Sequence, residues 1–382
     1  MKYKKIKLSD LVDTVSDTRK INKDKVVLIN TSDIFDGDVL NHSYTDNSNL
    51  RGQFKKRFEK NDILYSEIRP ANKRFAYVDF DSEDYIASTK LMVLRKRSNS
   101  ITNRFLYYCL TNDFFTEKMQ HLAEARSGTF PQITFDVLKN ESINAPSIEN
   151  QNKITMILDN INNKIKSNNE INNNLYELMK IKFNNYIDNL EEYEESVLSK
   201  IANYKNGLAM QKFRPIDEIG LPVIKIKEMN SGITSETERC RSDIDKDVII
   251  DNGDILFAWS GTLCMSIWCE GRAGLNQHIF KVTSDKYPKW FYYFWTLKYL
   301  DNFIEIAAGK ATTMGHIKRT ELDKAIVKIP DEKVMEKMDK IFTPMLNEYV
   351  NNSVESNNLS ELRDTLLPKL MDGEIDLDNI EI

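Results

Sequence analysis

Apolar residues recur at seven-residue intervals along two stretches of the chain, and this pattern predicts two long helices. The first stretch follows residue 146 and the second follows residue 331. The repeating apolar positions are Ile154, Ile157, Ile161, Ile171, Leu175 and Leu178 in the first stretch and Met338, Ile341, Met345, Leu359, Leu362 and Leu366 in the second. A seven-residue repeat is typical of helices that pair as a coiled coil.

One asparagine interrupts each apolar side, at Asn168 and at Asn352. Because a polar residue there costs stability but fixes register, we expect the two helices to pair with these residues facing or near one another. Two unrelated amphipathic surface helices are the alternative. Pro146 and Pro330 precede the helices, where proline suits a helix start, whereas Pro344 lies inside the second helix and is expected to kink or interrupt it.

The segment before each long helix has the pattern of a mixed α+β globule. Short β-branched and aromatic runs predict strands at 25–30, 62–66, 75–80, 91–96, 223–227, 254–259 and 278–282. Aromatic-rich stretches predict one helix in each globule, over 104–124 and 289–307. The chain therefore divides into a first globule at 1–145, a central long helix acting as a spacer at 146–198, a second globule at 199–330, and a C-terminal long helix and tail at 331–382.

The two halves of the chain are copies of one another. The sequence NNLYEL at 173–178 recurs as NNLSEL at 357–362, an offset of 184 that holds without a gap back to Thr129 and Thr313. Further upstream, Asp-Ile-Leu at 62–64 recurs at 254–256, an offset of 192. A tandem duplication with variable front parts and regular back parts accounts for both offsets.

The net charge of the whole chain differs in sign from the net charge of each globule. The chain has 53 Lys and Arg against 58 Asp and Glu, a formal charge of −5, which taken whole argues against a nucleic-acid partner. The first globule carries +4 and the second +3, however, while the two helical segments carry −4 and −8. Repeated clusters of lysine and arginine in both globules therefore favour a polyanionic partner, although any single cluster is usually a solvated face.

One pattern of polar residues is repeated at the same spacing in both copies. Arg126, Thr129 and Gln132 in the first copy correspond to Lys310, Thr313 and His316 in the second, each in the loop after the aromatic-rich helix. A cation with a hydroxyl suits a phosphate, and Gln or His can bond a base edge. Loop residues that only satisfy neighbouring backbone groups are the alternative.

Motifs for catalysis and for membrane insertion are not found. The sequence contains no phosphate-binding glycine loop, no dinucleotide-binding glycine motif and no histidine or cysteine spacing typical of zinc. The acidic run from Asp79 to Asp84 could hold a metal, but an exposed turn is the more common outcome for such a run. Four cysteines without a CxxC pair, and no signal-peptide or membrane-spanning stretch, lead us to expect a cytoplasmic protein with reduced thiols.

These residues carry a family resemblance. Two basic variable globules, each with an Asp-Ile-Leu strand and each followed by a regular long helix, resemble the specificity (S) subunit of type I restriction-modification systems, the HsdS family. The run LRDTLLPKLMDGEI at 362–375 is similar to the closing motif of that family. Two departures are that the first copy has LMKIKFNNYIDNLE instead of this motif, and Asn61 stands where Gly253 gives the commoner GDIL.

The resemblance implies a protein that binds DNA and is not itself an enzyme. Each globule would be a target-recognition domain for one half of a bipartite, asymmetric site. The two long helices would pair as an antiparallel coiled coil that holds two methyltransferase (M) subunits, with restriction/translocase (R) subunits completing the enzyme. S-adenosylmethionine, ATP and Mg would then belong to those partners, with no cofactor or metal on this chain and no membrane contact.

Candidate contacts with double-stranded DNA follow from the cation clusters and the repeated loops. In the first globule they are Arg69, Lys73, Arg74, Lys90, Arg126, Thr129 and Gln132. In the second they are Lys227, Ser260, Gln277, Lys310, Thr312, Thr313, His316 and Lys318. Two other classes of protein stay open: a nuclease built around Asp79–Asp84, and a coiled-coil scaffold that assembles proteins without recognising DNA.

Overall fold

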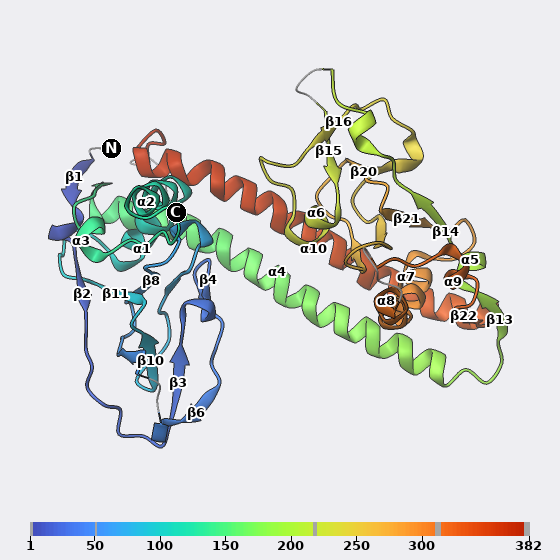
Figure 1. The fold of residues 1–382 in the computed structure, drawn as a ribbon, viewed down its shortest axis with the longest axis horizontal. Coiled ribbons are helices and arrows are strands. Elements are labelled where there is room, and N and C mark those ends of the chain that lie inside the picture. Colours follow the sequence, from blue (N-terminus) through green and yellow to red (C-terminus); the bar gives the residue numbers. More distant parts are fainter. Residues whose placement is uncertain (1–2, 50–51, 217–219, 310–314, 378–382) are drawn as a thin grey trace. The chain divides into compact units, whose positions relative to one another are not determined.

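The computed structural model describes residues 3–49, 52–216, 220–309 and 315–377 (Figure 1). The chain forms two compact units, Met1–Asn162 with Leu362–Ile382 and Asn163–Glu361. Each unit therefore contains one globular module and a part of each long helix. No helix in the described ranges is long and apolar enough to cross a membrane.

The first module is built on two four-stranded sheets, with strand orders β6-β3-β10-β7 and β2-β11-β8-β9. Two-stranded sheets β1-β12 and β4-β5 complete it. The strands are β1 Lys4–Lys7, β2 Val12–Val15, β3 Lys25–Ile29, β4 Ile34–Phe35, β5 Asp38–Val39, β6 Tyr44–Asp46, β7 Phe54–Lys56, β8 Ile63–Ser66, β9 Phe75–Tyr77, β10 Tyr85–Ser88, β11 Leu91–Lys96 and β12 Ser142–Ala145.

The second module repeats this topology. Its sheets have the orders β16-β15-β20-β17, β14-β21-β18-β19 and β13-β22. The strands are β13 Glu194–Val197, β14 Asn203–Asn206, β15 Leu221–Ile224, β16 Arg239–Cys240, β17 Ile249–Ile250, β18 Ile255–Ala258, β19 Cys264–Ile267, β20 Ala273–Leu275, β21 Ile279–Thr283 and β22 Ile326–Ile329. In each module one strand pair, β3 with β10 or β15 with β20, is parallel among antiparallel neighbours. The duplication predicted from the sequence is thus confirmed for three of the sheets, whereas the β4-β5 pair has no counterpart in the described part of the second module.

Short helices lie between the strands of both modules. They are α1 Asn103–Thr111, α2 Asp113–Arg126, α3 Phe135–Leu138, α5 Leu198–Ile201, α6 Ile226–Ser231, α7 Lys289–Lys298, α8 Leu300–Gly309 and α9 Arg319–Leu322. The prediction of one aromatic-rich helix per globule was wrong, because each stretch forms two helices. Asn112 is extended, with φ −66° and ψ 155°, and its side chain accepts the Phe115 N–H at 2.8 Å, so it caps a new helix.

The two long helices are α4 Ile148–Asp188 and α10 Glu332–Asp372. Their ends are offset by the same 184 residues that relate the two copies in sequence. Of the two predicted effects of Pro344, a kink or an interruption, the interruption was wrong, because α10 continues through it. Pro344 lies on an exposed face, where water can solvate the carbonyl that loses its helical hydrogen bond.

Polar contacts join the two helices within the second unit. The Asn168 Nδ2 donates to the Asn352 carbonyl at 3.4 Å and to Glu355 Oε2 at 2.8 Å. The Asn172 Nδ2 donates to the Tyr349 carbonyl at 3.0 Å, and its Oδ1 accepts from Asn352 Nδ2 at 3.1 Å. Residue 168 of α4 contacts residues 352 and 355 of α10, whereas residue 172 contacts the earlier residues 349 and 352, so the two helices run antiparallel. The predicted approach of the two asparagines is confirmed.

The residues of the seven-residue repeat, which were predicted to lie between the two long helices, differ in exposure. Ile154, Ile161, Asn168, Met338 and Asn352 are buried, and Ile157, Leu175, Ile341, Met345 and Leu359 are half-buried. Leu178 and Leu362 are 45% and 47% exposed. The helices stay in contact near both positions, since the Tyr186 ring of α4 meets the Phe342 ring of α10 edge-on and the Arg363 Nη1 of α10 donates to Asn162 Oδ1 of α4 at 3.1 Å. The predicted burial of Leu178 and Leu362 between the helices was therefore wrong.

Each long helix contributes side chains to a module core. Met179, Phe183 and Ile187 at the end of α4 are buried in the core of the second module. Leu370 of α10 and Leu377 after it are buried in the core of the first module, and the Tyr3 hydroxyl donates to the Leu370 carbonyl at 2.6 Å. The C-terminal motif of the sequence thus completes the first module.

Candidate nucleic-acid interface

Two loops meet at the same place in each module. In the first, a β-bridge pairs Ile68, after β8, with Gln132, and the Arg69 N–H donates to the Pro131 carbonyl at 3.1 Å. Backbone bonds hold the candidate Gln132 beside the loop after the Asp-Ile-Leu strand. Geometry therefore brings the two candidate loops of the first copy together.

The second module uses the same backbone bonds. A β-bridge pairs Ser260, after β18, with His316, and the Gly261 N–H donates to the Gly315 carbonyl at 2.8 Å. Ser260 is the counterpart of Ile68 at an offset of 192, and His316 is the counterpart of Gln132 at 184. In both modules, therefore, a loop related to its copy by the offset of 192 is hydrogen-bonded to a loop related to its copy by the offset of 184.

A third segment joins this arrangement in both modules. The Glu67 N–H donates to the Lys90 carbonyl at 3.0 Å, and the equivalent Trp259 N–H donates to the His278 carbonyl at 3.3 Å. His278 is therefore the counterpart of Lys90. We call these five matched positions the paired-loop frame: Glu67, Ile68, Arg69, Lys90 and Gln132 in the first module, and Trp259, Ser260, Gly261, His278 and His316 in the second.

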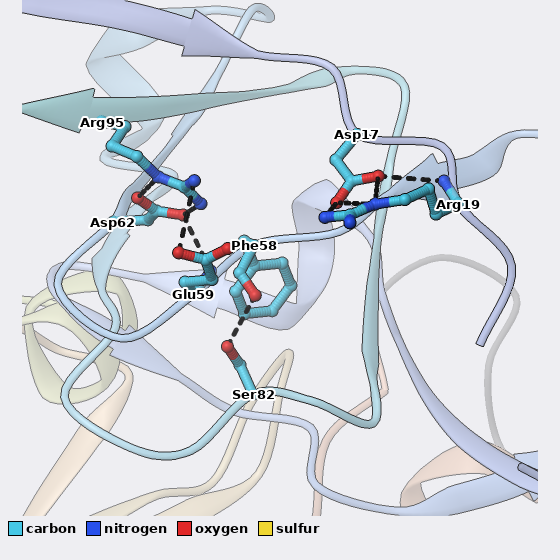
Figure 2. A network of polar contacts seen from close by, with 7 residues as sticks. All are labelled: Asp17, Arg19, Phe58, Glu59, Asp62, Ser82 and Arg95. Carbon is cyan, nitrogen blue, oxygen red and sulfur yellow. Dashed lines mark hydrogen bonds and ion pairs between the residues drawn. The ribbon is translucent and has the colours of Figure 1, made fainter. Parts of the chain in front are cut away.

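The Asp of each Asp-Ile-Leu strand anchors the turn that leads into the frame. Asp62 is 1% exposed, accepts the Glu59 N–H at 2.8 Å and forms two hydrogen bonds of 2.8 and 2.7 Å with Arg95 (Figure 2). The hydrogen bond with Asp62 raises the pKa of Arg95. In the second module Asp254 accepts the Asp251 N–H at 2.8 Å, and Lys281 lies 2.9 Å from it.

The residue before this Asp explains one departure from the family motif. Asn61 has φ 73° and Gly253 has φ 82°, both in the left-handed region. Glycine is the usual residue there and asparagine the next most tolerant. Asn61 therefore preserves the turn that Gly253 forms in the second copy.

In the first module, three candidate cations lie on the loop from Arg69 to Arg74. Arg69 and Lys73 are both left-handed, with φ 44° and 51°, and they flank a 3₁₀ turn at Pro70–Asn72. Burial opposes the charge on Lys73, but its ion pair with Asp113 at 2.7 Å outweighs this and raises the pKa of Lys73. The loop is held firmly by contacts within its own module.

Arg74 and Arg126 also bond groups of their own module. The Arg74 Nη1 donates to the Ile34 carbonyl at 3.0 Å, and its guanidinium lies over the Phe35 ring. The Arg126 Nη1 donates to Thr134 Oγ1 at 3.2 Å. Two further candidates, Lys90 and Thr129, are exposed. Phe130 was not predicted as a contact, although it is 50% exposed beside Thr129 and is the kind of flat side chain that stacks on bases.

The second module places aromatic rings at its paired-loop frame. The His316 ring meets the Trp259 ring edge-on with centroids 6.4 Å apart, and the His278 ring is tilted against the Trp259 ring with centroids 6.0 Å apart. Trp259 Nε1 and His278 Nδ1 are buried and have no hydrogen-bond partner in the described part of the chain. The predicted contact was the neighbouring Gln277, whose amide lies 3.2 Å from His278 Nε2, and neither Trp259 nor His278 was predicted.

The remaining candidates of the second module are partly described by the structure. Lys227 and Lys318 are exposed, whereas Ser260 is buried. Lys310, Thr312 and Thr313 lie outside the described residues.

The acidic run from Asp79 to Asp84 bonds residues of its own module. Asp84 pairs with Lys23 and accepts a hydrogen bond from the Tyr44 hydroxyl at 3.1 Å. No group of three His, Cys, Asp or Glu side chains placed to hold a metal occurs among the described residues. What the geometry brings together at the frame is a set of cationic, amide and aromatic groups with one carboxylate, Glu67.

Comparison with known proteins identifies the family. The family model for the type I restriction modification DNA specificity domain matches residues 1–177 and again 190–358. The chain belongs to this family. It is a sequence-specificity subunit of the type I restriction-modification class, and the two matched ranges correspond to its two copies.

Relatives span nearly the whole chain or most of it. The specificity subunit of the type I restriction enzyme HindI from Haemophilus influenzae is 25% identical, over 98% of this chain and 99% of the relative. The specificity subunit of MjaIX from Methanocaldococcus jannaschii is 23% identical, over 74% of this chain and 71% of the relative. The crystal structure of the type I S subunit from M. genitalium shares the fold, with a TM-score of 0.56 and 16% identity over 97% of this chain and 96% of that one.

Proposed function

We propose that each module recognises one half of a bipartite DNA site and that the two halves differ in sequence. The observation that carries this proposal is the paired-loop frame, in which equivalent backbone positions hold different side chains. Glu67, Lys90 and Gln132 in one module stand where the other has Trp259, His278 and His316. A palindromic site would need two alike recognition surfaces, and these are not alike.

The chain's own contribution is binding. The loops of the frame would enter the major groove, where amide and cationic side chains distinguish base pairs, while surrounding lysines and arginines hold phosphates. The duplex would be presented so that a partner subunit can flip out an adenine and methylate it. S-adenosylmethionine, ATP and Mg would be bound by the partners, and this chain would have no catalytic residue.

The long helices supply surfaces for the methyltransferase and restriction subunits. On α4, the apolar side chains of Ile171, Leu178 and Ile181 are 41%, 45% and 55% exposed. Positions 171 and 178 are seven residues apart, so these two side chains lie on nearly the same face of the helix. Apolar side chains aligned on one exposed face are suited to a protein partner rather than to phosphate.

The experiment that tests the function is a map of methylated adenines in host DNA with and without this gene. We expect one bipartite, asymmetric motif to lose methylation when the gene is removed and to regain it when the gene is restored. An unchanged map would contradict the proposal. A nuclease would instead cut DNA when the purified chain is incubated with Mg, and a scaffold would bind the methyltransferase without binding specific DNA.

Replacing Arg126 and Lys310 together by alanine is expected to weaken DNA binding and to flatten its salt dependence. Each phosphate contact contributes about 0.9 to the slope of log affinity against log salt, so two lost contacts reduce the slope by roughly 2. The measurement is a binding titration at several salt concentrations. A matched control replaces Lys180 and Lys340, two exposed lysines of the long helices, and should leave the slope unchanged. An unchanged slope for Arg126 and Lys310 would rule out these contacts.

A further inference from the structure

The backbone at Arg69 is held in a conformation that arginine rarely adopts. Its φ is 44° and its ψ is 76°, in the left-handed region. Only a few per cent of non-glycine residues have positive φ, because the Cβ atom crowds the backbone there. Residues kept in such conformations are found disproportionately at functional sites.

The second module has a glycine with the same left-handed backbone at the equivalent position. Gly261, the counterpart of Arg69, has φ 76°. A Cβ atom at Gly261 would meet nothing closer than Ile226 Cδ1 at 3.5 Å, which is an ordinary contact. Packing therefore does not require glycine at this position, whereas the left-handed conformation favours it. One copy relieves the strain with glycine and the other retains it with arginine.

Arg69 also differs from the two cations that follow it on the same loop. Lys73 is paired with Asp113, and Arg74 bonds the Ser32 and Ile34 carbonyls. The Arg69 side chain is exposed and makes no hydrogen bond, ion pair or ring contact with any described residue. Within this loop, two cations fasten the loop to its module and the third extends from it.

The loop that carries Arg69 is fixed on both sides. Pro70 is buried, and the Ala71 N–H donates to Gln120 Oε1 of helix α2 at 3.1 Å. The Arg69 N–H donates to Pro131 beside Gln132. A fixed backbone defines the point from which the side chain starts, so no backbone freedom of this loop has to be lost when the side chain binds.

We propose that Arg69 recognises a guanine in the half-site of the first module, and that its strained backbone is retained for this task. This inference rests on the proposed DNA-binding function. An arginine guanidinium can donate two parallel hydrogen bonds to the O6 and N7 atoms of guanine, which requires a defined direction. A phosphate could be held equally well by a flexible cation on an unstrained backbone. The second module, with Gly261, makes no such contact.

The test compares two substitutions of Arg69 with a control in the full-length chain. Arg69→Gly installs the residue of the second copy, and Arg69→Lys keeps the charge but cannot form the paired bonds. The control, Lys20→Gly, removes one charge from an exposed loop of the same module where φ is not positive. Each protein selects duplexes from a random-sequence library, and its melting temperature is recorded.

We expect wild type to select a bipartite motif with a guanine that both Arg69 variants no longer prefer, at a loss of roughly tenfold or more in discrimination at that base pair. The other half-site should be unchanged. Arg69→Gly should melt no lower than wild type, and Lys20→Gly should keep the whole motif.

Three results would overturn parts of this account and can be told apart. An unchanged motif with Arg69→Lys would make Arg69 a phosphate contact and refute guanine recognition. A melting temperature several degrees lower with Arg69→Gly would show that the side chain has a structural role. If wild type selects no motif at all, the proposed function fails before Arg69 is tested.

Discussion

Replacing Phe183 by alanine is expected to lower the free energy of unfolding of the second module by about 3 to 5 kcal/mol. Phe183 lies on α4 and is 1% exposed. Its ring stacks on Phe294 with centroids 5.4 Å apart and meets Trp295 edge-on at 5.6 Å. Alanine would leave a cavity among rigid aromatic neighbours, which cannot collapse to fill it.

Tryptophan fluorescence during urea unfolding measures this effect selectively. All four tryptophans of the chain, Trp259, Trp268, Trp290 and Trp295, lie in the second module. The matched control is Ile181→Ala, two residues earlier on the same helix and 55% exposed, which should change stability by no more than about 0.5 kcal/mol. Equal effects of the two substitutions would contradict the packing of α4 into this core.

Replacing Asp62 by alanine is expected to destabilise the first module by about 3 kcal/mol. Removing one partner of a buried ion pair leaves the other charge uncompensated, which costs about 3 to 5 kcal/mol. Arg95 is 35% exposed and can partly regain water, so the lower end of this range applies. The Glu59 N–H also loses its acceptor, so the turn that leads into β8 is weakened.

The thiol of Cys109 reports this change, because it is the one cysteine of the first unit. It is 4% exposed, and burial raises its pKa, so it should react with a thiol reagent only when the module opens. Labelling of Cys109 in increasing urea, followed by peptide mass spectrometry, gives the stability of the module. Glu59→Ala is the control, since Glu59 is 66% exposed and should contribute under about 1 kcal/mol. Labelling of Asp62→Ala at the wild-type midpoint would refute the structural role of this carboxylate.

Local signals and the internal repeat were sufficient to predict much of the fold. The heptad pattern and the offset of 184 placed both long helices, and Asn168 and Asn352 were placed together because a buried polar residue needs a partner. Sheet order could not be predicted, since the parallel pairing of Val27 with Tyr85 depends on side chains distant in sequence. Pro344 was misjudged because its effect depends on which face of the helix it occupies.

The candidate site was only partly predictable for a related reason. Cation clusters are visible in sequence, but Arg69, Lys73 and Arg74 are nearly adjacent and look alike there. Their difference arises from left-handed backbone and from partners such as Asp113, which only the folded loop brings near. Trp259 and His278 were overlooked because no single spacing relates them to Lys90 and Glu67. Glu67 and Trp259 are 192 positions apart, whereas Lys90 and His278 are 188 positions apart.

The burial of Leu377 in the first core bears on how the protein is made. Leu8 of the same core leaves the ribosome first, and Leu377 follows 369 residues later. The first module to be translated is therefore among the last to be completed. Until then, apolar side chains such as Phe105 would be left partly uncovered, a condition in which chains aggregate or engage chaperones. A ribosome that stops before residue 370 would therefore release a first module whose core lacks both Leu370 and Leu377.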